Sequence, residues 1–161
     1  MKKFFVVMLI LVFFNTSRAE DICSTVKSKK TSNRSIAIDF RNNIFNLTTS
    51  HPIQDFSISR SGKWLAAYGP KYTPKSRSEP NSVVTFVQLS NNGKIRTAID
   101  VEKGIYEIFF DIAEKKAYVS GTYGLTEIDL SNFHTKVRGI SSQEKDYSQL
   151  TGACPDIHLQ Y

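Results

Sequence analysis

Apolar and polar residues alternate along much of the chain, and one alternating stretch occurs twice. FSISRSGKWLAAYG covers residues 56–69, and IFFDIAEKKAYVSG matches it without a gap 52 residues later, over residues 108–121. Alternation with a period of two is typical of half-buried strands, and each copy has a polar turn at its centre, so each predicts a β-hairpin. The matched positions are Ile53 with Ile105, Phe56 with Ile108, Ile58 with Phe110, Leu65 with Ala117, Ala67 with Val119 and Gly69 with Gly121.

A second kind of strand pair lies around these hairpins and occurs three times. IAIDF (36–40), TFVQL (85–89) and TEIDL (126–130) are each followed by a polar turn and another β-rich run. The chain therefore predicts an all-β, antiparallel fold of β-hairpin repeats. Alternating hairpins are typical of propeller blades, which take ~40–50 residues each, and a closed ring needs at least about four blades. We expect an incomplete, two to three blade β-propeller-like fold whose open edges are covered by the termini or by a partner.

Residues 1–19 have the layout of a secretory signal peptide. Lys2 and Lys3 precede an apolar run over residues 4–14, and Ser17 and Ala19 provide small residues for cleavage. A bilayer of ~30 Å needs ~20 apolar residues, so this run is too short to span it; a buried N-terminal helix is the alternative interpretation. We expect an exported, soluble, periplasmic protein with no membrane insertion after cleavage. Residues 20–161 then form one domain with a polar C-terminal tail.

Charge and cysteine content narrow the function classes. Half of the net charge of +6 belongs to the signal segment, and removing that segment lowers the net charge to +3. The remaining basic residues cluster at 27–34 and 71–77, which indicates a solvated surface or attraction to an acidic partner. Nucleic-acid binding is not expected, because no nucleic-acid motif accompanies these clusters. Cys23 and Cys154 predict a disulfide in an oxidising compartment, and a cysteine nucleophile is the alternative.

The sequence holds no recognisable catalytic set, and we expect no enzyme activity, no metal and no cofactor. The histidines lack metal-ligand spacing, and neither a phosphate-binding glycine loop nor a serine nucleophile elbow is present. Asp39, Asp111 and Asp129 end strands or precede turns, where aspartate commonly caps the backbone; a catalytic pair among them is the alternative. A small hydrolase using His51 or His134 is the remaining enzyme hypothesis.

One segment breaks the repeat. After Gly69 the chain continues as PKYTPKSRSEPNS (70–82), whereas only three residues separate Gly121 from the next predicted strand. Long loops without structure are usually functional or disordered, and a tolerated insertion is the alternative. The three prolines restrict the loop in advance, its cations favour encounter with an acidic surface, and Tyr72 suits a contact surface.

The order of these features carries a family resemblance. A cysteine follows the signal segment, another lies near the C-terminus, and between them come FSISRSGKWLAAYG, a loop and VVTFVQLSNNGKIRTAIDVEKGIYEIFFDIAEKKAYVSG (83–121). Over residues 56–121 and the two cysteine positions, the chain resembles the propeller-like periplasmic immunity proteins of type VI secretion peptidoglycan amidase effectors. The resemblance implies a protein toxin of that class as partner, inhibited by a loop inserted into its active site. The loop differs from the family's short, Gly/Ser-rich loop in being longer, proline-rich and basic.

In that family a small hydroxyl residue of the loop engages the catalytic histidine of the toxin. The resemblance implies that Ser76, Ser78 or Ser82 does so here, with Ser82 nearest the family's spacing. The alternative function is a ligand-binding or structural envelope protein without enzyme activity, completed as a homodimer. The residues predicted to bind the partner are Tyr68, Lys71, Tyr72, Lys75, Ser76, Arg77, Ser78 and Ser82.

Overall fold

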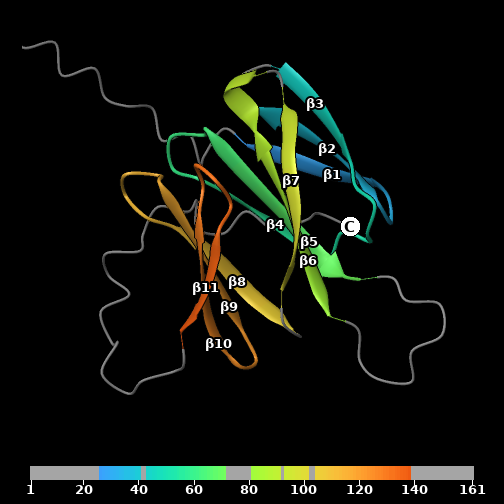
Figure 1. Ribbon diagram of the computed structural model, residues 1–161. Coiled ribbons are helices and arrows are strands. Elements are labelled where there is room, and N and C mark those ends of the chain that lie inside the picture. The colour runs from blue at the N-terminus through green and yellow to red at the C-terminus, as the bar shows by residue number, and fades with distance from the viewer. Residues whose placement is uncertain (1–25, 41–42, 72–80, 92, 102–103, 139–161) are drawn as a thin grey trace, which may run out of the picture.

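The computed structural model describes residues 26–40, 43–71, 81–91, 93–101 and 104–138 (Figure 1). These residues form three antiparallel sheets, numbered here in chain order. Sheet 1 consists of β1 (Lys27–Ser32), β2 (Ser35–Phe40) and β3 (Asn43–Thr48). Sheet 2 consists of β4 (Asp55–Ile58), β5 (Trp64–Pro70), β6 (Ser82–Gln88) and β7 (Lys94–Val101), with the 3-10 helix η1 (Leu89–Asn91) after β6. Sheet 3 consists of β8 (Ile105–Phe110), β9 (Lys116–Gly121), β10 (Gly124–Asp129) and β11 (Thr135–Arg138).

The all-β, antiparallel prediction is confirmed. Sheets 2 and 3 each connect their four strands in sequence order, and sheet 1 has three strands that match the last three of that pattern. The three sheets do not close into a ring, so the fold has the incomplete, blade-like arrangement expected from the chain length. Within the described ranges, no helix is long and apolar enough to cross a membrane.

The duplicated hairpins have the same strand register. In the first copy, β4 pairs with β5 so that Ile58 lies opposite Leu65. In the second copy, β8 pairs with β9 so that Phe110 lies opposite Ala117, the matched positions of the repeat. The repeat in the sequence is therefore a repeat of strand pairing, and each hairpin begins its own four-stranded sheet.

Strand β1 was missed by the pattern of the sequence. Its residues, KSKKTS, lie in the basic cluster at 27–34 and show no apolar alternation. The strand forms through antiparallel pairing with β2, where Lys29 lies opposite Ala37, and Ser28 is its one buried side chain. Lysine on an edge strand also discourages pairing with other molecules.

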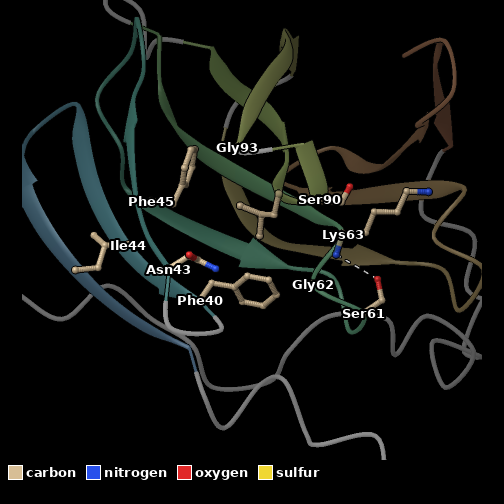
Figure 2. A pocket seen from close by; sticks show the side chains of 10 residues that line it. Phe40, Asn43, Ile44, Phe45, Ser61, Gly62, Lys63, Ser90 and Gly93 are labelled. Carbon is tan, nitrogen blue, oxygen red and sulfur yellow. Dashed lines mark hydrogen bonds between the residues drawn. The ribbon is translucent and has the colours of Figure 1, made fainter.

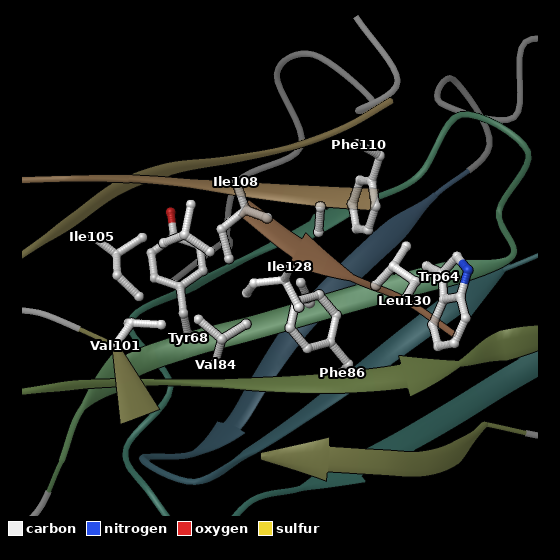
Figure 3. Close-up of a cluster of buried hydrophobic side chains, with 13 residues drawn as sticks. Trp64, Tyr68, Val84, Phe86, Val101, Ile105, Ile108, Phe110, Ile128 and Leu130 are labelled. Atoms are coloured by element: carbon white, nitrogen blue, oxygen red, sulfur yellow. The ribbon is translucent and has the colours of Figure 1, made fainter. Parts of the chain in front are cut away.

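Sheet 2 lies between the other two sheets and packs on both. One core cluster joins it to sheet 1 and includes Ile36, Phe56 and Leu65. The other joins it to sheet 3 and includes Trp64, Phe86 and Ile108, as Figure 3 shows. The matched apolar positions of the repeat are all buried, as predicted. In each copy they face the preceding sheet, which explains why one pattern serves both hairpins.

Candidate functional site

The strand ends and turns form two opposite ends of the molecule. The β4–β5 and β8–β9 turns lie side by side, because the backbone N–H of Ser61 donates to Glu114 Oε1 (2.7 Å) and its hydroxyl to Oε2 (2.5 Å). We call this the turn end. Strands β5 and β9 run away from it, so Lys71 and Asn81, the described ends of the β5–β6 connection, and the β9–β10 turn (Thr122 and Tyr123) lie at the opposite end, the loop end (Figure 1).

Two predicted partner-binding residues prove to be part of the scaffold. Tyr68 is 5% exposed and packs between sheets 2 and 3, as Figure 3 shows, and Ser82 at the start of β6 is 7% exposed. Burial, together with the charges of Asp55 and Glu107, raises the pKa of Tyr68, so its hydroxyl stays protonated. Their assignment to a contact surface is wrong, because β5 and β6 are covered by a neighbouring sheet on each face.

Lys71 lies at the exposed base of the β5–β6 connection. Its backbone N–H donates to the carbonyl of Asn81 (2.7 Å), directly after the last ladder pair, Pro70 with Ser82. Its ammonium group forms an ion pair with Asp100 of β7. The base of the connection is therefore closed by backbone and side-chain contacts. The predicted residues Tyr72, Lys75, Ser76, Arg77 and Ser78 lie outside the described residues, as do Cys23 and Cys154 of the predicted disulfide.

Two exposed tyrosines add to the loop end. Tyr106 is 68% exposed and Tyr123 is 60% exposed, and the hydroxyls of Tyr106 and Thr122 are hydrogen-bonded at 3.3 Å. Tyr106 was not predicted. A signal existed in the sequence, because Tyr106 and Glu107 interrupt the alternation between Ile105 and Ile108, where the structure has a β-bulge. Exposed tyrosines are common anchors of protein interfaces.

The turn end holds a cleft that the sequence did not predict (Figure 2). It lies between sheets 1 and 2 and has a volume of about 690 Å³. The rings of Phe40 and Phe45 lie against Gly62 and Gly93, so closely that a Cβ atom on either glycine would overlap the ring. Both glycines also have φ near +70°, which favours glycine. The lining residues are Phe40, Asn43, Ile44, Phe45, Ser61, Gly62, Lys63, Leu89, Ser90 and Gly93.

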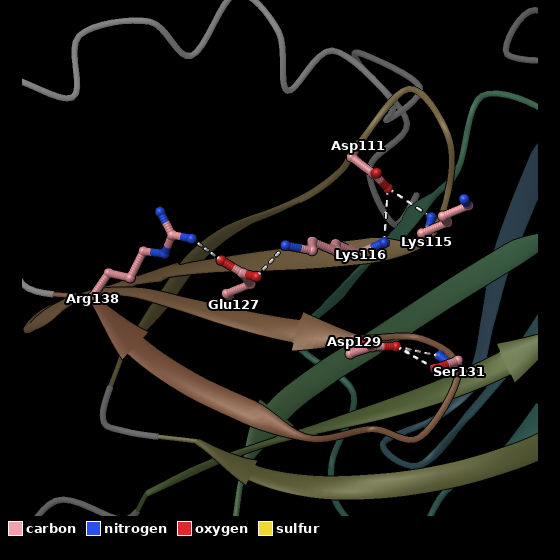
Figure 4. A network of polar contacts seen from close by, with 7 residues as sticks. All are labelled: Asp111, Lys115, Lys116, Glu127, Asp129, Ser131 and Arg138. Carbon is pink, nitrogen blue, oxygen red and sulfur yellow. Dashed lines mark hydrogen bonds and ion pairs between the residues drawn. The ribbon is translucent and has the colours of Figure 1, made fainter.

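The aspartates considered as catalytic candidates cap turns. Asp111 Oδ1 accepts the backbone N–H groups of Lys115 (2.7 Å) and Lys116 (2.8 Å), and Asp129 Oδ1 accepts the N–H (2.8 Å) and hydroxyl (2.6 Å) of Ser131 (Figure 4). The bonds from Ser131 lower the pKa of Asp129. These contacts bear out the capping role expected of both residues. Asp39 lies on β2, opposite Lys27 of β1.

The outward face of sheet 3 carries a chain of ion pairs across three strands. Glu127 of β10 accepts a hydrogen bond from Lys116 Nζ (2.5 Å) and pairs with the guanidinium of Arg138, as Figure 4 shows. The hydrogen bond from Lys116 is the main cause that lowers the pKa of Glu127, and the same bond raises the pKa of Lys116. Each charge has a partner, so this cluster joins strands and offers no proton donor or acceptor near neutral pH.

His51 and His134, the two histidines of the enzyme hypothesis, form hydrogen bonds within the fold. His51 is 2% exposed and hydrogen-bonded through both ring nitrogens, to the Pro52 carbonyl and the Thr85 hydroxyl, each at 2.8 Å. His134 lies in the exposed β10–β11 turn, where its backbone N–H donates to Asn132 Oδ1 (2.8 Å). In the part of the chain that the structure covers, no three metal-ligating side chains come together.

No protein-family model matches the sequence, and no curated protein matches it at a significant level. The resemblance to amidase immunity proteins therefore remains a prediction from the sequence pattern. The geometry itself offers two candidate sites, the loop end and the cleft of the turn end, at opposite ends of the strands.

Proposed function

We propose that the protein is a periplasmic immunity protein: an exported inhibitor without enzyme activity that binds a secreted peptidoglycan amidase. The β5–β6 connection would enter the active site of the amidase. The observation that carries this proposal is the braced base of that connection, at an end that also exposes Tyr106 and Tyr123.

The braced base favours inhibition because binding is stronger when less of the binding loop has to be ordered. The ladder between Pro70 and Ser82, the bond from Lys71 to Asn81 and the ion pair with Asp100 fix both ends of the connection before a partner arrives. Prolines at positions 74 and 80 restrict the chain between those ends.

The buried position of Ser82 changes the choice of inhibitory hydroxyl. A residue that enters a partner's active site must leave its own scaffold, and Ser82 is 7% exposed within β6. Ser76 and Ser78, in the middle of the connection, are therefore the better candidates. Tyr106 and Tyr123 would contact the amidase around its active site, since large aromatic side chains often supply much of the binding energy of an interface.

The test replaces residues 71–81 by Asn-Gly, which closes a two-residue hairpin turn between Pro70 and Ser82 and keeps their pairing. The candidate partner is sought in the neighbouring gene: a secreted amidase encoded there is purified and its affinity is measured by calorimetry, whereas a neighbour that encodes no such effector would count against the proposal. We expect affinity to fall at least 100-fold with an unchanged melting temperature. Affinity within threefold of the wild type would overturn the role of the loop, and an amidase that the wild type neither binds nor inhibits would overturn the function.

A matched pair of surface substitutions tests the tyrosines in the same assay. Tyr123→Ala at the loop end should weaken binding about 10-fold, in the range of interface anchors. Ile112→Ala is the control, because Ile112 is 76% exposed but lies in the β8–β9 turn at the opposite end. Equal effects of the two substitutions would contradict the assignment of the loop end as the interface.

A further inference from the structure

The repeat places two acidic side chains near each other at the loop end. Asp55 of β4 and Glu107 of β8 are 52 residues apart, so they occupy the same position of the two hairpins. Both strands run from the loop end to the turn end and contact each other, and both acids lie near the loop end of their strands. Burial is the main cause that raises the pKa of Tyr68, and the charges of Asp55 and Glu107 add to it, so both carboxylates lie near one hydroxyl.

Two exposed tyrosine rings adjoin this acidic pair. Tyr106 precedes Glu107 in the β-bulge of β8, and its hydroxyl is hydrogen-bonded to that of Thr122 at 3.3 Å. The backbone N–H of Thr122 donates to the Gly104 carbonyl (3.1 Å), which holds the turn that carries Tyr123 beside the start of β8. Both rings therefore belong to one surface before a partner arrives. The acidic–aromatic patch, as we call this surface, consists of Asp55, Tyr106, Glu107 and Tyr123.

The charge of the acidic–aromatic patch is negative. Glu107 is exposed, and no ion pair among the described residues includes it. Lys71, at the same end, is already paired with Asp100 of β7. Arg34, in the β1–β2 turn, belongs to sheet 1 on the other side of sheet 2. Carboxylates and the faces of aromatic rings both attract cations, so the patch favours a positively charged group.

We infer that the acidic–aromatic patch binds an arginine side chain of the amidase, an inference that rests on the proposed function for the identity of the partner. A guanidinium group is planar, stacks on aromatic rings and pairs with carboxylates, so it matches both kinds of group in the patch. An acidic group would be repelled by Asp55 and Glu107. Because the β5–β6 connection carries Lys75 and Arg77, the loop end presents both signs of charge, which fixes the orientation of the partner.

A small probe tests this chemistry without the amidase. N-acetyl-arginine amide is titrated into the folded full chain and followed by amide NMR shifts, and N-acetyl-citrulline amide, which has a similar shape without the charge, is the control ligand. We expect saturable shifts at residues 55, 104–107 and 122–123, and about threefold weaker binding of the citrulline compound. Glu107→Gln should weaken arginine binding about threefold. Asp39→Asn, which removes one negative charge from sheet 1, should leave it unchanged. The inference is overturned if no saturable shifts occur at the patch, if both ligands bind equally, or if both acid variants weaken binding equally.

Calorimetry with the amidase separates this inference from the proposed function. Glu107→Gln removes the charge, and Tyr106→Leu keeps an apolar side chain but removes the ring. Each should weaken amidase binding about fivefold with an unchanged melting temperature. Wild-type affinity in both variants would overturn the patch as an arginine contact and leave the role of the β5–β6 connection standing. An amidase that does not bind the wild type, together with saturable binding of the arginine probe, would overturn the amidase as the partner of the patch.

Discussion

His51 is a buried side chain that the fold holds in its neutral form. Because the Pro52 carbonyl can only accept a hydrogen bond, Nδ1 carries the proton and Nε2 accepts from the Thr85 hydroxyl. These bonds tie the β3–β4 connection to the middle of β6. Burial lowers the pKa of His51 from its ordinary value of 6.5, and the positive charge of Arg34 adds to this effect.

Acid should therefore weaken the fold through His51. Below about pH 6.5 the unfolded chain gains a proton at this residue that the folded chain resists, so stability is complete above that pH and falls as the pH drops towards the lower folded value. Urea unfolding at pH 7 and pH 5 should show a lower midpoint at pH 5. His51→Gln removes the titrating group and should reduce this difference, although it also lowers stability at pH 7. His134→Gln, in an exposed turn, is the control; an unchanged pH dependence in His51→Gln would contradict the assignment.

At the scale of elements, the two hairpins hold each other through their turns. Glu114 occupies the repeat position of Gly62, and both have positive φ, +51° and +72°. In the second copy a glutamate thus accepts the conformation that glycine prefers, and its carboxylate binds Ser61 of the first copy. The contact joins sheets 2 and 3 at the turn end, away from the apolar core between them.

Substitutions at Glu114 should distinguish the stability contributed by its two hydrogen bonds to Ser61 from the cost of its positive φ. Glu114→Ala and Glu114→Gly both lose the two bonds to Ser61, at a cost of about 1–3 kcal/mol in unfolding free energy. Glycine also relieves the positive φ, so we expect it to cost about 0.5–1 kcal/mol less than alanine. Chemical unfolding measures both values. Ala113→Gly is the control, because Ala113 has no positive φ to relieve; alanine less costly than glycine would contradict the strain.

Alternation predicted the hairpins well because β4 and β9, and β8 beyond its bulge, bury alternate residues. It failed for strands that do not have one buried face and one exposed face. Strand β1 has no apolar residue and depends on β2 for its pairing, so its own sequence carried no signal. Strands β5 and β6 are buried on both faces, so Tyr68 and Ser82 lie inside although a one-faced strand would expose such residues.

The candidate sites were predictable to different degrees. The long β5–β6 connection was visible as a departure from the repeat, because the same position after Gly121 has a short turn. The cleft was not visible, since it depends on how Phe40 and Phe45 meet glycines far away in the sequence. Contacts between sheets follow from their packing, which the pattern of one strand does not contain.

At the scale of the whole molecule, both end sheets present polar outward faces. Trp64, Ala66 and Tyr68 of β5 pack on sheet 3, and the repeat positions on β9 are Lys116, Tyr118 and Ser120. Because Ala117 and Val119 face inward, these three residues lie on the outward face. The outward face of sheet 1 carries exposed Lys27 and Lys29, which alternate with buried Ser28. The repeat thus loses its apolar residues where no further sheet follows among the described strands.

We therefore expect a monomer in solution rather than a homodimer that completes a ring. A dimer formed through these faces would have to bury Lys116 and its ion-pair partners, which is costly unless every charge stays paired. Size-exclusion chromatography with light scattering should give the monomer mass. Lys116→Trp with Ser120→Tyr places the residue types of β5 on this face and should promote self-association, because it creates an exposed apolar patch. Lys115→Trp, in the adjacent turn, is the control. The prediction would be contradicted by a wild-type dimer, or by a double variant that associates no more than the control. Either result would show that the polar outward face of sheet 3 is not what prevents a further sheet from packing on it.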